Sequence, residues 1–349
     1  MPTEQEVMEA LRQVKDPELH RNLVDLNMVR DLKISPQGKI SFTLALTVPS
    51  CPLREQISAE TRRVLQALPG VSEVEVVFGA MTPEERRAAL GSAVPALPKL
   101  NQFNKVRHLV AIMSGKGGVG KSSITSLLAV TLARQGYKVG ILDADITGPS
   151  IPKLFGLPPG GLRGGDQGIL PAMTHLGVKV VSTNLLVKAE DTAVIWRGPV
   201  ISGAIQQFWT DVLWGKLDYL LVDLPPGTSD ASLTVLQSLP LTGVVLVTTP
   251  QDLAALVVRK AMAMLVQLNI PILGVVENMS YFKCPDCGSV HQIFGPSHLA
   301  EIEKAAGRPL PSVRLPIMPD FAALADSGKI EEAQSKEFEQ FAPALLQKP

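Results

Sequence analysis

Cysteine, net charge and long apolar runs are all scarce in this sequence. It has three cysteines, and its 33 basic residues balance its 33 acidic residues. A neutral chain offers no electrostatic footprint for nucleic acid or for an anionic membrane. No apolar run reaches the roughly 18 residues of a transmembrane helix. We therefore expect neither a nucleic-acid partner nor a membrane partner.

The first 16 residues lack the layout of a secretion signal. They carry four acidic residues, whereas a signal peptide opens with basic residues that an apolar stretch follows. We therefore expect a cytoplasmic protein. In a reducing compartment an odd number of cysteines, two of them at Cys284 and Cys287, argues against a disulfide framework. Reactive or metal-binding thiols are favoured instead.

The length of 349 residues suggests two domains. Within residues 1–80 the order of apolar periodicities is helix, strands, helix, strand. The apolar residues alternate strictly over 40–48, for example, and return to helical spacing over 53–68. This order predicts a small α/β domain. Residues 81–104 become rich in alanine and proline, so we interpret them as a linker.

Residues 105–349 change to short continuous apolar runs, each bounded by glycine, proline or charged residues. Such runs indicate strands that are buried on both faces, as in parallel sheets. Helical periodicity lies between several of them, for example over 122–134 and 253–268. The alternation predicts an α/β fold with a doubly wound, mostly parallel sheet. The runs are 109–113, 139–142, 178–181, 219–222, 244–247 and 272–276.

A phosphate-binding motif follows the first of these runs. Residues 115–122 read GKGGVGKS and match G-x-x-x-x-G-K-S/T between an expected strand and an expected helix. Glycines let backbone N–H groups turn toward phosphate oxygens, and the helix N-terminus adds a favourable dipole. We expect Lys121 to reach the β- and γ-phosphates of ATP and the Ser122 hydroxyl to ligate Mg²⁺. The predicted nucleotide-binding residues are Gly115, Lys116, Gly117, Gly118, Val119, Gly120, Lys121, Ser122 and Ser123.

Aspartates end two later apolar runs, at Asp143 and Asp145 and at Asp223. The carboxyl ends of parallel strands lie beside the phosphate loop, where Mg²⁺ and an attacking water must be held. We expect Asp145 to orient the water and Asp223 to lie on the metal side. For Asp145 and Asp223 the alternative is capping of the helix that follows.

Lys116 makes the motif resemble that of the deviant Walker ATPases, the group of MinD, ParA and the nitrogenase iron protein. In that group this lysine crosses a dimer interface to the partner's nucleotide. The resemblance therefore implies a homodimer in which Lys116 is catalytic together with Lys121. Residues 143–150, DADITGPS, resemble the switch I segment of the group, and residues 223–230, DLPPGTSD, resemble its switch II segment.

Within that group the likeness is greatest to the Mrp/ApbC/Nbp35 iron–sulfur cluster carriers. The shared strings include DITGPSIP at 145–152 and ENMSYFKCPDCG at 277–288, and the likeness spans about residues 105–330. It implies ATP hydrolysis and a labile [4Fe–4S] cluster. Apo-protein clients and cluster assembly factors would be the partners. It also implies adenine contacts at Asn278 and Pro316.

Cys284 and Cys287 form a C-x-x-C pair, which alone fits a zinc site, a redox dithiol or half of a cluster site. Zinc needs two further ligands, and His291 and His298 follow in the sequence. A redox dithiol should open a helix, which Gly288 disfavours. An iron–sulfur cluster usually takes four thiolates, and two chains related by a two-fold axis supply four. We favour the bridging cluster, with zinc and redox roles as alternatives.

Parts of the first domain, residues 14–32 and 47–52, resemble the MIP18 (DUF59) family, a small domain found in iron–sulfur assembly factors. Cys51 follows the alternating strand and precedes Pro52, a favoured first helical residue. A helix N-terminus there would stabilise the thiolate of Cys51. The alternative is a buried, inert side chain.

The sequence therefore predicts an ATP hydrolase that acts as a cluster carrier, with a P-loop NTPase domain after a small MIP18-like domain. The alternative is a positioning ATPase like MinD or ParA, whose C-x-x-C is a structural zinc or redox site. A membrane-binding version needs a basic amphipathic tail, whereas residues 330–343 are acidic and interrupted by proline. A third possibility, an electron donor like the nitrogenase iron protein, would have single, widely spaced cysteines.

Overall fold

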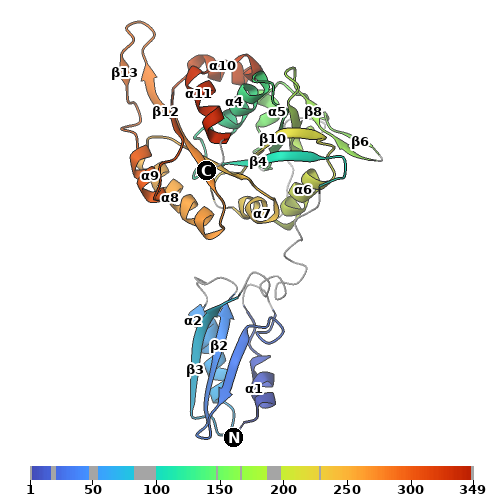
Figure 1. Cartoon of the computed structure of the whole chain (residues 1–349), viewed down its shortest axis with the longest axis vertical. Coiled ribbons are helices and arrows are strands. Elements are labelled where there is room, and N and C mark those ends of the chain that lie inside the picture. Colours follow the sequence, from blue (N-terminus) through green and yellow to red (C-terminus); the bar gives the residue numbers. More distant parts are fainter. Residues whose placement is uncertain are drawn as a thin grey trace. The chain divides into compact units, whose positions relative to one another are not determined.

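The structure is a computed structural model of the whole chain, and it divides into two compact units, Met1–Ala96 and Leu97–Pro349. Figure 1 shows both. Most of the predicted linker, 81–104, lies outside the described residues. The structure describes residues 2–16, 21–46, 54–81, 100–146, 148–165, 167–186, 198–227 and 229–346.

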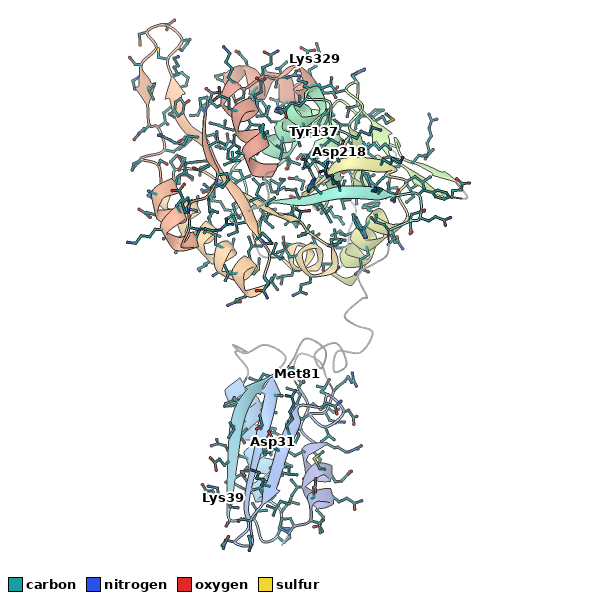
Figure 2. The ribbon with its side chains drawn as sticks, viewed as in Figure 1. Asp31, Lys39, Met81, Tyr137, Asp218 and Lys329 are labelled. Atoms are coloured by element: carbon teal, nitrogen blue, oxygen red, sulfur yellow. The ribbon has the colours of Figure 1, made fainter. Side chains whose placement is uncertain are left out.

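The first unit follows the predicted order of elements. The three strands that its described residues form make one sheet in the order β1-β2-β3, with β1 and β2 antiparallel and β2 and β3 parallel. The alternation along β2 buries Ile40, Phe42 and Leu44 in the core of this unit. Asp31 takes a left-handed φ of 52° where the register of β1 on β2 shifts (Figure 2). The elements are α1 (Glu4–Leu11), β1 (Val29–Ile34), β2 (Lys39–Leu46), α2 (Arg54–Gln66) and β3 (Glu73–Ala80).

The second unit is built on a nine-stranded sheet, counted over the described residues. The path runs β13-β12-β11-β4-β10-β5-β9-β8, and β14 pairs with β12. Only β8 and β13 run antiparallel to their neighbours in this sheet. Its strands are β4 (Lys105–Ser114), β5 (Val139–Asp143), β8 (Ala172–Met173), β9 (Lys179–Val181), β10 (Lys216–Asp223), β11 (Gly243–Thr248), β12 (Ile272–Lys283), β13 (Val290–His291) and β14 (Ser312–Pro316). A separate antiparallel pair joins β6 (Arg163–Gly165) and β7 (Gly168–Leu170).

Helices cover both faces of this sheet, as Figure 1 shows. Continuous apolar strands such as β11 are buried along their whole length, which requires cover on each side. One core lies under α4 (Lys121–Arg134), α5 (Ile151–Leu154), α10 (Pro319–Asp326) and α11 (Lys336–Leu346). The other lies under α6 (Gly198–Thr210), α7 (Asp230–Ser238), α8 (Asp252–Gln267) and α9 (Leu299–Ala306). Short 3-10 turns complete the unit at η2 (Thr183–Leu185) and η3 (Ile330–Glu332). The predicted doubly wound, mostly parallel fold is confirmed.

Two elements differ from the expectation. The apolar run 272–276 is only the first part of β12, which continues as backbone pairing to Lys283. The polar side chains from Glu277 onward end the apolar run and not the strand. The tail is also not interrupted by proline, because α11 runs through Pro343 and buries Phe338 and Phe341. Among the described residues no helix combines the length and apolarity needed to cross a membrane.

The buried Trp214 offers a test of the assigned core. Its indole N–H donates to the carbonyl of Phe208 at 3.0 Å, and the side chain is fully buried. Because Trp214→Ala removes this volume and this donor, we expect the free energy of unfolding of the second unit to fall by about 3–5 kcal/mol in a urea titration. The control is Phe103→Ala, whose side chain is 53% exposed and which should change stability by about 0.5 kcal/mol or less. Equal losses would contradict the assigned core.

Candidate functional site

The phosphate loop connects β4 to α4 at the carboxyl edge of the parallel strands. Gly118 and Gly120 both have a φ of 80°, a left-handed conformation that turns the loop into the helix. An open pocket is lined by residues 116–123 of the loop together with Asp145, Ser150 and Pro226. Backbone N–H groups and a helix N-terminus around such a pocket suit a phosphate group.

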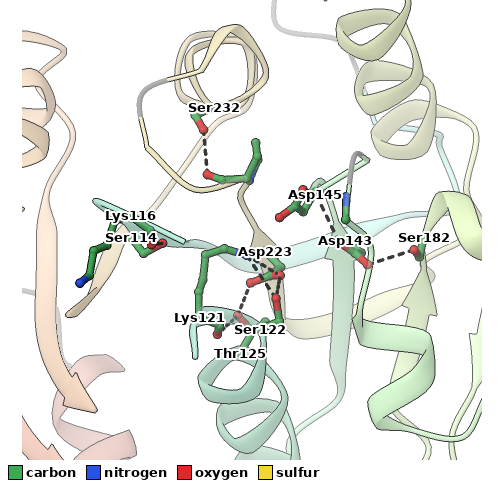
Figure 3. A network of polar contacts seen from close by, with 12 residues as sticks. Ser114, Lys116, Lys121, Ser122, Thr125, Asp143, Asp145, Ser182, Asp223 and Ser232 are labelled. Carbon is green, nitrogen blue, oxygen red and sulfur yellow. Dashed lines mark hydrogen bonds and ion pairs between the residues drawn. The ribbon is translucent and has the colours of Figure 1, made fainter. Parts of the chain in front are cut away.

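The carboxylate of Asp223 is the centre of the polar network beside this loop (Figure 3). Its Oδ2 accepts from Lys121 Nζ at 2.7 Å and from Ser122 Oγ at 2.6 Å. Its Oδ1 accepts from Thr125 Oγ1 at 2.6 Å. Asp223 is fully buried and Lys121 is only 6% exposed, so this is a desolvated ion pair that the two hydroxyls complete.

Asp143 lies next to Asp223 in the sheet, because the two residues are partners in the β5–β10 ladder. Asp143 Oδ2 accepts from Ser182 Oγ at 3.0 Å, and its Oδ1 accepts from the backbone N–H of Asp145 at 3.2 Å. Burial raises the pKa of Asp143 well above its usual range, and the neighbouring charge of Asp223 raises it further. Asp143 therefore holds the backbone at Asp145, whose side chain faces the pocket.

Asp145 is the third residue of the segment that resembles switch I, 143–150. Its Oδ1 accepts from the backbone N–H of Gly148 at 3.2 Å. Asp145 is 9% exposed and lines the pocket. This places a carboxylate across the pocket from the phosphate loop, where it can orient a water molecule. Thr147 of this segment and Thr228 of the predicted switch II lie outside the described residues.

The ammonium of Lys116 contacts its own chain, where it donates to Oε1 of Gln251 in the β11–α8 connection. The backbone carbonyl of Lys116 accepts from Ser114 Oγ at 3.1 Å. The Lys116 side chain lines the pocket and is not part of the Asp223 network.

Asn278 is in β12 and Pro316 is in β14. The amide of Asn278 donates to the backbone carbonyl of Val119 at 3.0 Å. Pro316 is the last residue of β14 and is the ladder partner of Tyr281. Neither residue lines the pocket described above, and Gly115 does not line it either.

Cys284 and Cys287 lie in the turn of the hairpin that β12 and β13 form. The backbone N–H of Cys284 donates to the carbonyl of Ser289, and that of Gly288 donates to Cys284, each at 2.9 Å. Cys284 is half-buried and Cys287 is exposed, and both thiols are free. The Ser289 hydroxyl lies 3.2 Å from the Cys287 sulfur, and this hydrogen bond lowers the pKa of the Cys287 thiol. A lower pKa favours the thiolate, the form that binds metals.

The thiol pair has no further protein ligand nearby in the described part of the chain. There, no three histidine, cysteine, aspartate or glutamate side chains are grouped so that they could hold a metal ion. His291 is in β13 and His298 is at the start of α9. The prediction for Cys51 lies outside the described residues.

Three polar residues of the site were missed by the sequence analysis: Thr125, Ser182 and Gln251. Thr125 could have been found, because it is one helical turn after Lys121 and so shares its face of α4. Ser182 and Gln251 carry no motif. They contact residues 39 and 135 positions away in the sequence, and only the folded chain brings them together.

Comparison with known families assigns both units. Residues 105–348 match the ParA family described as the NUBPL iron-transfer P-loop NTPase. Residues 4–76 match a family described as an iron–sulfur cluster assembly protein. The first match alone covers more than half of the chain.

Individual proteins agree with these matches. An iron–sulfur cluster carrier protein of Synechocystis is 46% identical over 82% of this chain and 79% of its own length. One from Aquifex aeolicus is 40% identical over 93% of this chain and 91% of its own. A nucleotide-binding protein from Archaeoglobus fulgidus, solved in complex with ADP, is 47% identical with a TM-score of 0.61, over 68% of this chain and 92% of that one. The cell division ATPase MinD of Pyrococcus furiosus, 20% identical over 69% of this chain and 99% of its own with a TM-score of 0.51, shares the fold.

The fold, the phosphate loop and these matches agree, and they fix the family of the chain. The chain belongs to the iron–sulfur cluster carrier family of ParA-type P-loop ATPases, with an iron–sulfur assembly domain at its N-terminal end.

Proposed function

We propose that two copies of this chain together bind and slowly hydrolyse Mg²⁺-ATP and carry one labile [4Fe–4S] cluster for transfer to apo-proteins in the cytoplasm. The observation that carries the proposal is the thiol pair. Cys284 and Cys287 are free, accessible and without a third ligand in the described part of the chain, on a P-loop ATPase body. Assembly factors that load the cluster and client proteins that accept it would be the partners.

The phosphate-loop residues divide the ATP chemistry between them. Lys121 lines the pocket, and its ammonium neutralises charge on the β- and γ-phosphates. Ser122 Oγ and Asp223 Oδ2 lie 2.6 Å apart and are hard oxygen donors of the kind Mg²⁺ prefers, so they fit this cation. When bound, Mg²⁺ supplies charge neutralisation between the phosphates. Asp145 orients the attacking water from across the pocket.

Lys116 would complete the partner's site in a dimer. In the single chain its ammonium contacts Gln251, and Lys116 lines the open pocket, from which a partner could be reached. The contact with Gln251 also keeps the charge hydrogen-bonded while no partner is present. Formation of the dimer would exchange Gln251 for the phosphates of the partner's nucleotide.

The cluster assignment follows from the number of ligands. A cubane usually takes four thiolates, and each chain supplies two on one accessible hairpin. The cluster would then lie on the two-fold axis at a surface, from which it can be given up. A positioning ATPase of the MinD type needs a basic amphipathic tail, whereas α11 has Glu337 and Glu339 in its first turn and packs Phe338 into the core.

Lys121→Ala tests the nucleotide site. We expect ATP turnover to fall by at least about 10²-fold, because the charge that stabilises the transition state is removed. The change also removes the ion-pair partner of the buried Asp223 carboxylate, which lowers the stability of the fold. Thermal unfolding is therefore measured together with phosphate release. Lys304→Ala, an exposed lysine in α9, is the matched control and should keep full turnover. Undiminished ATP hydrolysis by a folded Lys121→Ala variant would contradict the assignment of the nucleotide site.

Lys116→Ala tests action across the dimer. The variant should bind nucleotide and hydrolyse it poorly, because its missing charge belongs to the partner's site. Mixing Lys116→Ala chains with Lys121→Ala chains should restore part of the activity, since a heterodimer contains one site with both lysines. The measurement is phosphate release from isolated heterodimers carrying two different tags. No recovery there would place Lys116 in its own chain's site.

Cys284→Ser and Cys287→Ser test the bridging cluster. Anaerobic reconstitution of the wild-type chain with iron and sulfide should give about four irons per dimer, one cubane for two chains. Each serine variant should lose the cluster absorption and keep ATP binding, because the thiols lie outside the phosphate loop. Cys51→Ser is the matched control and should retain the iron. One tightly bound zinc ion per chain with no iron uptake would refute the bridging cluster and would leave ATP hydrolysis as the remaining part of the proposal.

A further inference from the structure

Strand β12 connects the two sites of the second unit. It passes the phosphate loop at Asn278, where the side-chain amide donates to the Val119 carbonyl at 3.0 Å. It ends at Lys283, the residue before Cys284. The fit at the loop is close, because a Cβ on Gly120 would overlap the Asn278 amide nitrogen. Five residues therefore separate a direct contact with the phosphate loop from the thiol pair.

The residue before Asn278 is firmly anchored. Glu277 is fully buried, and its carboxylate accepts from Ser297 Oγ at 3.0 Å and from the backbone N–H of His298 at 3.1 Å. It also accepts from Ser280 Oγ at 2.5 Å and pairs with the Arg314 guanidinium at 3.5 Å. A buried carboxylate with this many partners holds its backbone in place. Glu277 is thus a fixed point of β12, directly before Asn278.

An irregularity lies just there. Met279 has a left-handed φ of 53°, which is rare and strained for a residue with a side chain. The register of β12 on β14 shifts between Glu277 and Tyr281, so residues 278–280 form a bulge. Bulges concentrate near functional sites and redirect the strand that carries them. The loop contact of Asn278 is made from within this bulge.

Beyond the bulge the strand is regular again. The Tyr281 carbonyl accepts from the Ile317 N–H at 2.7 Å, and Phe282 and Lys283 pair with β13 at His291 and Val290. Figure 1 shows the β12–β13 hairpin extending from the body of the second unit. A displacement of the strand at the bulge is therefore passed along the backbone to the hairpin and to the thiols in its turn.

We propose that Asn278 is a positioning residue that reads the state of the phosphate loop and transmits it through the 278–280 bulge to Cys284 and Cys287. The loop turns its N–H groups toward phosphate, which fixes the peptide that follows Val119 and hence its carbonyl. The hydrogen bond from Asn278 is then stronger in one nucleotide state than in the other, which is the differential contact that coupling requires. The inference rests on the proposed function, for which it supplies the link between ATP and cargo.

The test is the alkylation rate of Cys284 and Cys287 in the cluster-free full chain, measured by mass spectrometry with iodoacetamide. Mg²⁺ and a non-hydrolysable ATP analogue should slow alkylation by about fivefold, the shift that one neutral hydrogen bond supports. Asn278→Asp removes the donor at nearly constant shape, and Met279→Gly relieves the left-handed residue and loosens the bulge. Both should lose the nucleotide effect at saturating analogue. Asn269→Gly is the matched control, since Asn269 also has a left-handed φ, 54°, before β12 begins, and it should keep the effect.

Two further measurements distinguish failure of the coupling from failure of the proposed function. Calorimetry establishes that the analogue saturates each protein, and iron uptake establishes the carrier role. Protection that persists in both Asn278→Asp and Met279→Gly overturns the proposal, because the thiols then respond by another route. A wild-type chain that binds the analogue and takes up iron, yet alkylates at one rate in both states, overturns the coupling and leaves the proposed function intact. A chain that fails to bind the analogue or iron refutes the proposed function itself.

Discussion

The buried carboxylate of Asp223 is the constraint on which the nucleotide site depends. A charge without solvent is costly unless it is paired and hydrogen-bonded. Lys121, Ser122 and Thr125 meet that need from three positions on one end of α4. The start of the helix is thereby fixed at the carboxyl edge of the sheet, directly after the phosphate loop. The residues that we propose to bind the nucleotide therefore also hold α4 against the sheet.

Features formed by residues close together in the sequence could be predicted, whereas features formed by residues far apart in the sequence could not. The phosphate loop is a local motif, and the strands around it are continuous apolar runs, so both were predicted. Strand β12 was recognised only to residue 276, because Glu277 and Asn278 interrupt the apolar pattern while the backbone pairing continues. An apolar pattern in the sequence indicates which positions are buried. It is interrupted at a buried polar residue, even where the strand continues.

The contacts that no pattern revealed are those between distant residues. Gln251 meets Lys116 across 135 positions and Ser182 meets Asp143 across 39. Gly120 shows that a residue of a local motif is also constrained by a residue distant in the sequence. Its place in the motif is explained by backbone conformation, but the structure adds a steric reason, since Asn278 fills the space a side chain would need. Two positions 158 residues apart are therefore constrained by one another.

The hairpin that carries the thiols is a short one. Only two residue pairs join β12 to β13, and a two-stranded ribbon of that length is marginally stable in water by itself. Covalent bonds from sulfur to a metal cluster would tie the turn together in the way that a structural zinc ties a small domain. If the proposed cluster is bound there, it would order the turn, and its transfer to another protein would leave the turn less ordered. The degree of order of this hairpin would then depend on whether a cluster is bound.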